Sequence, residues 1–390
     1  MSERVRVLVV DDSALMRKLI PIILSRDPSI EVVGTAMDGA FALKKIEELQ
    51  PDVVTLDLEM PRMDGIETLR LIMRRTPLPV ILFSTHSKEG AYSTFKALAL
   101  GAIDFVAKPK DAAAGNLDSI AGQLIEKVKV AKRAGGKRIQ VPQIEEKPPS
   151  KKSGRASFPP NRIIAIGIST GGPNALQFAL SQIPGDFPAT ILVVQHMPEG
   201  FTEMFAKRLD ECCALDVQEA HSGDLLVAGR VLICPGNRHM MVRRMPRGDM
   251  AVLSDAPSVN GHRPSADVLF HSVAQEFGPT AVGIIMTGMG EDGAEGLGAI
   301  RNSGGMTIAQ SEDTCVVSGM PRAAILKGYA NKIVPLDGLA AYLVNHYHTD
   351  RSYSEKEKTE KIERQDKQEK QEKQEKQDRN ERTPVSSNRT

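Results

Sequence analysis

Short aliphatic runs alternate with amphipathic segments along the first 130 residues, and this alternation limits the fold more than any other feature of the sequence. The aliphatic runs have the length of buried strands, and the segments between them carry apolar residues at helical spacing. Strands that alternate with helices form parallel sheets covered by helices on both faces. The expected strands are 5–10, 30–36, 52–57, 78–84 and 102–107, and the expected helices are 15–26, 41–50, 66–75 and 91–101.

The same alternation returns at residue 163 and continues to about residue 346. It predicts a second α/β domain, because strands and helices again follow one another along the chain. The strands expected in this second domain are 163–168, 190–195, 230–236, 281–287 and 306–310.

Two further segments lack this pattern. The stretch between the two domains is rich in Lys, Pro, Ser and Gly, which is typical of an exposed linker. The last forty residues repeat Lys, Gln and Glu and have almost no apolar side chains, so they are expected to be disordered, and a partner-docking role for them stays open. The predicted division is a first domain at 1–130, a linker at 131–160, a second domain at 161–348 and a charged tail at 349–390.

Composition excludes several classes of protein. The net charge of +1 over 390 residues argues against a surface that binds nucleic acid or other polyanions. The four cysteines have neither the spacing of a zinc site nor that of a disulfide framework. Charged residues stand too early for a signal peptide, and no apolar run approaches the length of a membrane span. We therefore expect a soluble cytoplasmic protein without direct membrane insertion.

Acidic and polar residues follow the expected strands of the first domain. Functional residues of parallel α/β sheets collect where the strands end. Carboxylates clustered there repel one another, and a hard cation such as Mg²⁺ stabilises them. A single acid after a strand could instead cap a helix, but five matched positions favour a functional site. They are Asp11 and Asp12 after the first strand, Asp57 at the end of the third, Ser84 at the end of the fourth and Lys108 after the fifth.

Residues 4–125 resemble a response-regulator receiver domain through the segments VVDDS, TLDLEMPRMDG, FST and AKP. The resemblance implies a flavodoxin-like (βα)5 fold that has no output of its own, so the second domain must carry the activity. The implied roles are phosphoacceptor for Asp57, Mg²⁺ ligand for Asp11, Asp12 and Asp57, phosphoryl contact for Ser84 and Lys108, and aromatic switch position for Phe105.

A loop of small residues joins strand to helix in RIIAIGISTGGPNALQFAL, residues 162–180 of the second domain. A phosphate-binding P-loop would need Lys and Ser or Thr after the glycines, where Pro and Asn stand, and a dinucleotide fingerprint would need Gly in place of Ser169. Two interpretations remain. The loop is a structural turn, or it carries a nucleophilic serine, because Gly167, Ser169 and Gly171 form the pattern G-x-S-x-G. A hydroxyl there would lie near a helix N-terminus, which stabilises developing negative charge.

A nucleophilic serine needs a base, and His196 stands at the carboxyl end of the buried strand that follows the Ser169 helix. His262, in NGHRPSADVLF, is the only serious rival. A base in turn needs a carboxylate to fix its tautomer, and the glycine-rich loop GMGEDGAEG carries Asp292. Asp292 could instead cap the helix that follows it. Because three strand ends supply Ser, His and Asp to one sheet edge, the pattern predicts nucleophilic hydrolysis.

Across residues 4–346 the chain resembles the chemotaxis response regulators that act as protein-glutamate methylesterases. The matching segments of the second domain are AIGISTGGPNAL, VVQHMPEGFT, GHRPSADVLF and MTGMGEDGAEGL, and the order Ser, His, Asp differs from that of α/β-hydrolases. The resemblance implies a doubly wound, parallel-sheet esterase domain. The implied roles are nucleophile for Ser169, general base for His196, orienting acid for Asp292 and pocket or oxyanion hole for Thr170 and Met289, with no catalytic role assigned to His262 or Arg263.

The implied activity is hydrolysis of glutamate methyl esters on the cytoplasmic helices of chemoreceptors, with release of methanol and accompanying deamidation of glutamine. A chemotaxis histidine kinase would donate the phosphoryl group, Mg²⁺ would serve the receiver alone, and the esterase reaction would need no cofactor. We further expect the first domain to cover the active-site edge of the second until Asp57 is phosphorylated. The competing hypothesis is a receiver-controlled scaffold whose serine loop is not catalytic. Without a DNA-reading helix-turn-helix, no nucleic-acid partner is expected.

Overall fold

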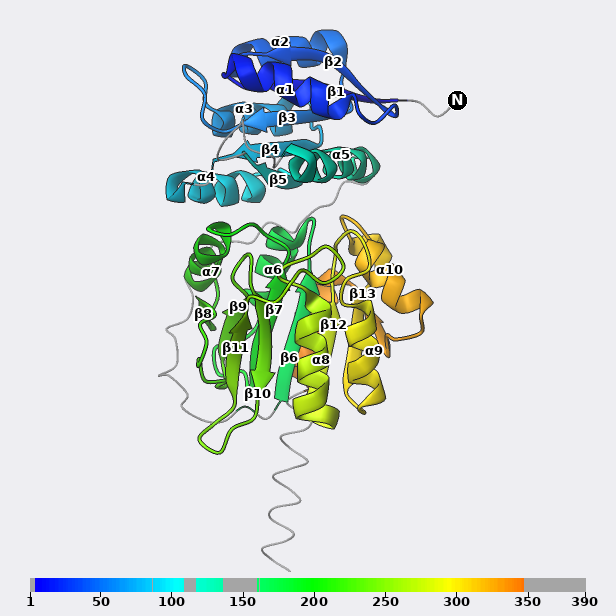
Figure 1. The fold of residues 1–390 in the computed structure, drawn as a ribbon. Coiled ribbons are helices and arrows are strands. Elements are labelled where there is room, and N and C mark those ends of the chain that lie inside the picture. Colours follow the sequence, from blue (N-terminus) through cyan, green and yellow to red (C-terminus); the bar gives the residue numbers. More distant parts are fainter. Residues whose placement is uncertain (1–3, 86, 109–116, 136–159, 161, 347–390) are drawn as a thin grey trace, which may run out of the picture. The chain divides into compact units, whose positions relative to one another are not determined.

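The computed structural model describes residues 4–85, 87–108, 117–135, 160 and 162–346. The predicted tail lies outside the described residues, as does most of the predicted linker, so the four segment boundaries stay predictions. Within the described ranges, no helix is long and apolar enough to cross a membrane. The elements of these ranges form two parallel sheets, each with its own helices, and a small antiparallel sheet (Figure 1).

Five parallel strands form the sheet of the first domain, in the order β2-β1-β3-β4-β5 (Figure 1). This is the flavodoxin-like, doubly wound order, in which the direction of winding reverses beside β1. The predicted strands are confirmed to within two residues at each end. Their bounds are Val5–Val10 (β1), Ile30–Ala36 (β2), Val53–Asp57 (β3), Val80–Ser84 (β4) and Asp104–Ala107 (β5).

Helices cover both faces of this sheet because alternate strand residues point to opposite sides. On one face, Val7, Val9, Ile81 and Phe83 pack against α1 (Ala14–Leu24) and α5 (Leu117–Ala134). Helix α5 was not among the predicted helices. The other three helices pack side by side, and their bounds are Gly39–Leu49 (α2), Gly65–Arg75 (α3) and Lys88–Ala99 (α4).

Seven parallel strands form the sheet of the second domain, in the order β14-β13-β12-β6-β7-β9-β8. The central strand β6 (Arg162–Ile168) pairs with β7 (Ala189–Gln195) on one side and β12 (Ala281–Ile285) on the other. Winding reverses beside β6, and such a switch point is where α/β sheets bind ligands. The remaining strands are Asp216–Glu219 (β8), Arg230–Ile233 (β9), Met306–Gln310 (β13) and Lys332–Val334 (β14).

The sequence did not predict β8, β14 or an antiparallel hairpin of β10 (His239–Arg243) and β11 (Met250–Ser254). These strands are short and mix polar with apolar residues, so they lack the aliphatic runs that marked the others. The helices of this domain are Gly172–Leu180 (α6), Phe201–Cys212 (α7), Ala266–Phe277 (α8), Ala294–Asn302 (α9), Gly319–Leu326 (α10) and residues 336–346, with short 3₁₀ turns at Gly278–Thr280 and Glu312–Thr314.

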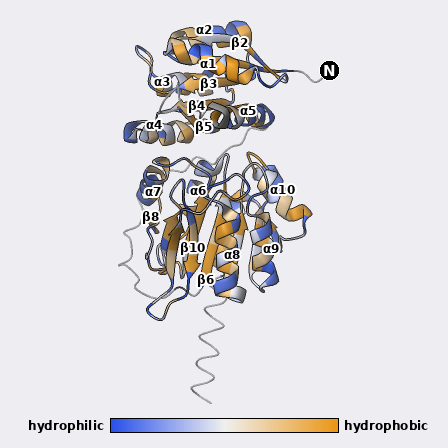
Figure 2. Cartoon of the chain, viewed as in Figure 1, coloured by the Kyte–Doolittle hydropathy of each residue, from blue (hydrophilic) through white to orange (hydrophobic). Residues whose placement is uncertain are grey.

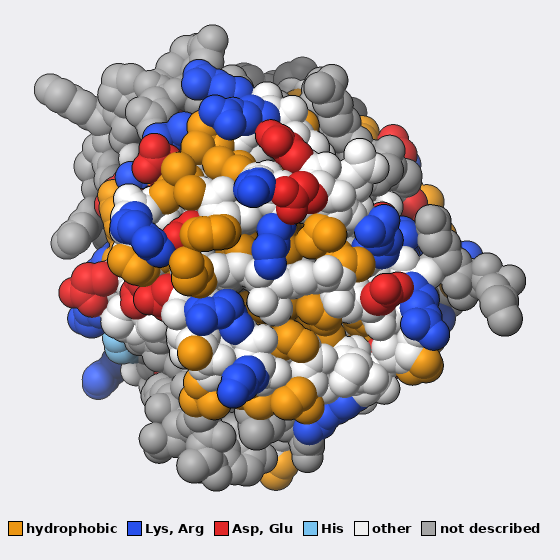
Figure 3. Space-filling view, turned by 90° about the horizontal axis from the view of Figure 1, so that it is seen from above, with side chains coloured by type: hydrophobic (Ala, Val, Ile, Leu, Met, Phe, Trp, Pro, Cys, Tyr) orange, Lys and Arg blue, Asp and Glu red, His pale blue; other side chains and the backbone are white. Residues whose placement is uncertain are grey.

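Hydropathy follows the fold in both domains. The strands of the two parallel sheets are mostly hydrophobic, whereas the helices carry apolar and polar sides (Figure 2). On the face drawn in Figure 3, Lys and Arg side chains are interspersed with acidic and apolar ones rather than gathered in one basic patch. This distribution agrees with the near-zero net charge of the chain.

Candidate active site and acidic pocket

Ser169 lies in the loop that joins β6 to α6, at the carboxyl end of the central strand. Its backbone N–H donates to the carbonyl oxygen of Thr287 at 2.9 Å, which fixes the loop to the end of β12. Gly171 caps α6 with a φ of 76°, and a Cβ at this position would clash with Val316. The tight turn and the half-buried serine are therefore features of the same loop, and the structural interpretation does not compete with the chemical one.

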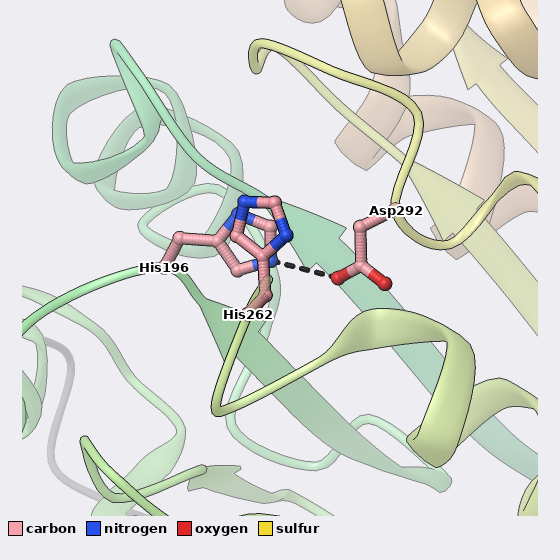
Figure 4. Close-up of side chains that lie close together, drawn as sticks. All are labelled: His196, His262 and Asp292. Carbon is pink, nitrogen blue, oxygen red and sulfur yellow. Dashed lines mark hydrogen bonds and ion pairs between the residues drawn. The ribbon is translucent and has the colours of Figure 1, made fainter. Parts of the chain in front are cut away.

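His196 follows β7 and reaches the same edge of the sheet. Its backbone N–H donates to the carbonyl oxygen of Ile168 at 3.0 Å, so the histidine and Ser169 follow paired strand ends. Its Nε2 lies 2.8 Å from Oδ2 of Asp292 (Figure 4). An ionised carboxylate only accepts, so Nε2 carries a proton, and in the neutral ring Nδ1 carries the lone pair. This Nδ1 is buried without a hydrogen-bond partner among the described residues, and Ser169 Oγ does not bond it here.

Asp292 is fully buried in the loop after β12. Besides His196, its carboxylate accepts from Ser265 Oγ at 2.6 Å and from the backbone N–H of Ala266 at 2.7 Å. Burial raises the pKa of Asp292, but the hydrogen bond and charge of His196, with the bonds from Ser265 and Ala266, outweigh burial and lower this pKa to about 2. The carboxylate therefore stays ionised. It satisfies the N-terminus of α8, whereas the following helix α9 begins at Gly293 without a side-chain cap.

Thr170 and Met289 flank Ser169 in different ways. Thr170 is buried, and its carbonyl oxygen accepts from Thr287 Oγ1 at 3.0 Å. A Cβ at Gly288 would lie 2.8 Å from the Cβ of Ser169, so the loop that carries Met289 approaches the serine closely only because this residue is glycine. The backbone N–H of Met289 donates no hydrogen bond within the described part of the chain. This N–H is therefore available to a hydrogen-bond acceptor.

Sequence reasoning missed two residues that hold this site together. Gln195 is buried, and its side-chain Nε2 donates to the carbonyl oxygens of Ser169 at 3.0 Å and of His196 at 3.2 Å. One amide thus ties the serine loop to the histidine loop. Ser265 fixes Asp292, as described above. The available signals were a polar residue that ends an aliphatic strand and a serine just before a helix.

His262, the rival base, lies against His196 rather than in its place (Figure 4). The ring centroids are 4.1 Å apart and the ring planes differ by 18°. Ligand atoms of His196, His262 and Asp292 all lie within 4.8 Å of one another, a spacing that could suit a metal ion. However, nearly parallel rings hold their lone pairs in separate, nearly parallel planes, and Asp292 already accepts from four donors. The arrangement fits proton transfer better than metal coordination.

The acidic pocket of the first domain lies at the carboxyl edge of its sheet. Lys108 Nζ lies 2.6 Å from Asp57 Oδ2 and 3.2 Å from Asp11 Oδ2. Burial raises the pKa of Asp57 to about 6, with a further contribution from the charge of Asp11, although Lys108 opposes both. Burial likewise raises the pKa of Asp11. Burial would lower the pKa of Lys108, but the hydrogen bond and charge of Asp57, together with the charge of Asp11, outweigh burial and raise this pKa, so the lysine stays charged.

The carboxylates of this pocket fit Mg²⁺ by their chemistry and spacing. Oxygen atoms of Asp11, Asp12 and Asp57 lie within 4.8 Å of one another, and hard oxygen donors are the ligands that Mg²⁺ prefers. Asp11 Oδ2 is buried and has no hydrogen-bond partner among the described residues, although Lys108 Nζ forms an ion pair with it at 3.2 Å. An atom in this state is suited to a cation.

Ser84 and Phe105, the two other residues predicted to act in this domain, have different surroundings from the carboxylates. The Ser84 hydroxyl accepts from Thr94 Oγ1 at 2.6 Å and donates to the carbonyl oxygen of Gly90 at 3.1 Å, so it is engaged with α4. The structure does not bring this hydroxyl into contact with Asp57. Phe105, the predicted switch position, is buried at the start of β5.

The two folds and the polar residues at their sheet edges define a class of protein: a response-regulator receiver domain joined to a second, doubly wound α/β domain that has the residues of a serine hydrolase at its sheet edge. A family model described as "Response regulator receiver domain" matches residues 7–116, and one described as "CheB methylesterase" matches residues 164–343. A crystal structure of the Thermotoga maritima CheB methylesterase catalytic domain is 38% identical and covers 47% of this chain and 97% of its own, with a TM-score of 0.47.

Relatives cover nearly the whole chain. Protein-glutamate methylesterase/protein-glutamine glutaminase 2 of Koribacter versatilis is 61% identical over 346 residues, which cover 87% of this chain and 95% of the relative. The protein-glutamate methylesterase/protein-glutamine glutaminase of Symbiobacterium thermophilum is 48% identical over 356 residues, which cover 87% and 97%. The chain belongs to the protein-glutamate methylesterase/protein-glutamine glutaminase family, and the resemblance inferred from the sequence motifs is confirmed.

Proposed function

We propose that this chain hydrolyses glutamate methyl esters on chemoreceptors, with release of methanol, and deamidates receptor glutamine at the same site. We propose further that phosphorylation of Asp57 activates this reaction. Family membership supports the substrate class, and the geometry around His196 supports the chemistry. The observation that carries the proposal is the buried, ionised Asp292 bonded to Nε2 of His196, which leaves Nδ1 unpartnered beside the serine loop.

In the first step, Ser169 Oγ attacks the carbonyl carbon of the ester while its proton passes to Nδ1 of His196. Asp292 holds the ring in the tautomer that accepts at Nδ1 and stabilises the imidazolium that forms. The negative charge on the carbonyl oxygen is met by the free N–H of Met289, with Thr170 at the wall of the pocket. Collapse of the tetrahedral intermediate expels methanol, which takes its proton from Nδ1.

In the second step, water attacks the acyl-enzyme and gives its proton to Nδ1 of His196. The bond between the acyl carbon and Ser169 Oγ then breaks, which releases the glutamate side chain, and Oγ takes the proton from Nδ1, which restores both the serine hydroxyl and the base. A glutamine side chain would pass through the same tetrahedral oxyanion, with ammonia as the leaving group. One site therefore accounts for both activities in the names of the relatives.

For the first domain, we propose that a chemotaxis histidine kinase phosphorylates Asp57. Asp11, Asp12 and Asp57 would hold Mg²⁺, which supplies positive charge to offset the phosphoryl oxygens. Lys108 would contact one of these oxygens from its place beside Asp57. Ser84 would contact another after its hydroxyl leaves α4, which makes this serine the moving part of the pocket. The esterase reaction uses only side chains and the backbone, so no cofactor is proposed for it.

A serine-directed fluorophosphonate tests the nucleophile and separates an enzyme from a scaffold. We expect the full chain to be labelled once, on the peptide that contains Ser169. Ser169→Ala should abolish the label, and His196→Ala should slow it strongly because the base is lost. Ser181→Ala is the matched control, since Ser181 lies at the other end of α6 and its hydroxyl donates to the carbonyl oxygen of Phe178. Unlabelled wild-type protein, or a label on another serine, would contradict the assignment.

A further inference from the structure

Backbone hydrogen bonds and a tight turn fix the position of His262, a residue without an assigned role. Val259 and His262 exchange two backbone hydrogen bonds, at 3.0 and 2.9 Å. The two residues between them, Asn260 and Gly261, have φ angles of 51° and 76°. This is a two-residue hairpin turn with positive φ at both central positions, for which Asn-Gly is the favoured pair. The turn therefore fixes the backbone that carries the His262 ring.

The loop around this turn is anchored on both sides. Asn260 donates through Nδ2 to Asp267 Oδ2 at 3.1 Å, which ties the turn to α8. On the other side, Arg263 donates to Asn237 Oδ1 and to the carbonyl oxygens of Asp255 and Ala256. These bonds engage the guanidinium of Arg263, so its part is to fix the loop.

One hydrogen bond sets the tautomer of His262. Its Nδ1 lies 2.8 Å from the carbonyl oxygen of Asn260, and a carbonyl oxygen only accepts. The proton is therefore on Nδ1, and the ring is neutral with a lone pair on Nε2. Burial lowers the pKa of His262, and the neighbouring His196 lowers it further, so the neutral form is favoured.

We propose that His262 is a positioning residue for the general base: its neutral ring lies flat against His196, limits the rotation of that ring and favours the imidazolium that forms during attack by Ser169. The proposal rests on the triad proposed above. The reasons are the stacking geometry and the charge that develops. When the Ser169 proton moves to Nδ1, a positive charge appears on a ring whose centroid is 4.1 Å from that of His262. The face of a neutral aromatic ring attracts such a charge.

The charged groups around the two rings favour His196 as the base and His262 as the positioning residue. Asp292 is bonded to His196 and only influences His262 through space, so the two imidazoles differ in their nearest anion. Four other titratable or charged groups on the elements around His262 have their own partners. They are Arg263 on its own loop, Asp255 after β11 bonded to Arg238, Asp267 on α8 bonded to Asn260 and Gly296, and His239 on β10 bonded to Pro257 and Ser265.

The test compares three variants of the full chain on a methylated chemoreceptor fragment. His262→Ala removes the ring, His262→Phe keeps a flat ring that cannot titrate, and His221→Ala is the matched control at an exposed histidine. The measured quantities are kcat, KM, the melting temperature and the pH at which kcat/KM falls to half on its acid side. For His262→Ala we expect about a tenfold loss in kcat with KM unchanged, and an acid midpoint about half a unit lower, because the imidazolium is less favoured.

The phenylalanine variant decides between the ring face and its nitrogen atoms. We expect His262→Phe to stay within about threefold of wild type and to keep the wild-type midpoint, since the ring face remains. The proposal is overturned if His262→Ala matches wild type, if His262→Phe is as slow as His262→Ala, or if only KM or the melting temperature changes. His196→Ala separates the two levels of inference: retained activity there would contradict the triad, whereas an inactive His196→Ala beside a fully active His262→Ala would contradict this proposal alone.

Discussion

The two polar sites of this chain occupy the same place in their sheets, the carboxyl edge, but treat a buried carboxylate in opposite ways. In the acidic pocket, burial and the nearby Asp11 raise the pKa of Asp57 to about 6. At the esterase edge, Asp292 is as deeply buried, yet hydrogen bonds from His196, Ser265 and the start of α8 lower its pKa to about 2. The first carboxylate is destabilised as an anion, and the second is stabilised.

The difference lies in the number of donors and suits the two proposed tasks. Asp57 accepts from Lys108 and the backbone N–H of Glu59, and it shares the lysine with a second acid. Such a carboxylate is ready to gain a cation and to be phosphorylated. Asp292 has four donors, which stabilise its negative charge and fix its orientation. The environment of Asp57 therefore suits a carboxylate whose charge changes, whereas the environment of Asp292 suits one whose charge stays constant.

The largest expected effect is loss of the nucleophile or the base. Ser169→Ala and His196→Ala should each lower ester turnover by about 10³-fold or more, because triad members act as one unit. The fold should persist, since Ser169 is a small residue at a loop end. Methanol release and thermal unfolding are the measurements, with Ser181→Ala as control. Near-normal turnover by either variant would remove the triad, and a fully inactive His262→Ala would make His262 the base.

Loss of the Asp292 carboxylate should have the second-largest effect. Asp292→Asn should lower kcat by about 10²- to 10⁴-fold with little change in receptor affinity, because His196 loses the anion that sets its tautomer. The neighbouring Glu291→Gln is the control, since Glu291 is exposed and its carboxylate forms an ion pair with Lys327. If Asp292→Asn melted early but turned over normally per folded molecule, Asp292 would serve only to cap α8.

The third prediction concerns Asp57, the carboxylate that we propose is phosphorylated. Asp57→Ala should keep basal esterase activity but lose its response to acetyl phosphate with Mg²⁺, because no group is left to carry the phosphoryl charge. Glu47→Gln, at an exposed acid on α2, is the control. A fragment that begins near residue 157 should be faster than the unphosphorylated whole chain if the first domain inhibits the second. A slower fragment would instead mean that the first domain stimulates or targets the enzyme.

The smallest expected effect is on stability, and it has opposite signs at the two sites. The pKa of Asp292 is lower than in the unfolded chain, so this carboxylate contributes about 2 kcal/mol above pH 4 that is lost as pH falls toward 2. The pKa of Asp57 is raised, so its contribution is complete below pH 4 and is lost as pH rises through about 6. Urea unfolding of Asp292→Asn and Asp57→Asn against wild type, from pH 2 to 7, measures both trends. Equal slopes would contradict the comparison.

Much of this could be predicted from the sequence because parallel α/β domains are locally encoded. Aliphatic runs marked ten of the strands, and the rule that function collects at strand ends brought His196 and Asp292 to one edge. The same rule brought Asp57 and its partners to one edge of the first sheet, family resemblance added their roles, and the relatives bear out the family. The catalytic and ligand roles of individual residues stay predictions.

What the sequence could not give were features that depend on tertiary contacts. Asp292 was weighed as a cap for the helix after it, but it bonds the N-terminus of α8, which precedes it by 26 residues at Ala266. The Ser84 hydroxyl was expected among the phosphoryl contacts, and in this structure it bonds α4 instead. The role of Gln195 in joining two loops needs the partner carbonyl groups in place before it becomes visible.

The central claim is that the site of Ser169, His196 and Asp292 does the chemistry and that the acidic pocket around Asp57 controls it. Methanol release from a methylated chemoreceptor, measured for the full chain with and without acetyl phosphate and Mg²⁺, tests this most directly. We expect wild type to release methanol and to accelerate with the phosphodonor, Asp57→Ala to release methanol without acceleration, and Ser169→Ala to release none. Methanol release by Ser169→Ala, or none by phosphorylated wild type, would contradict the account.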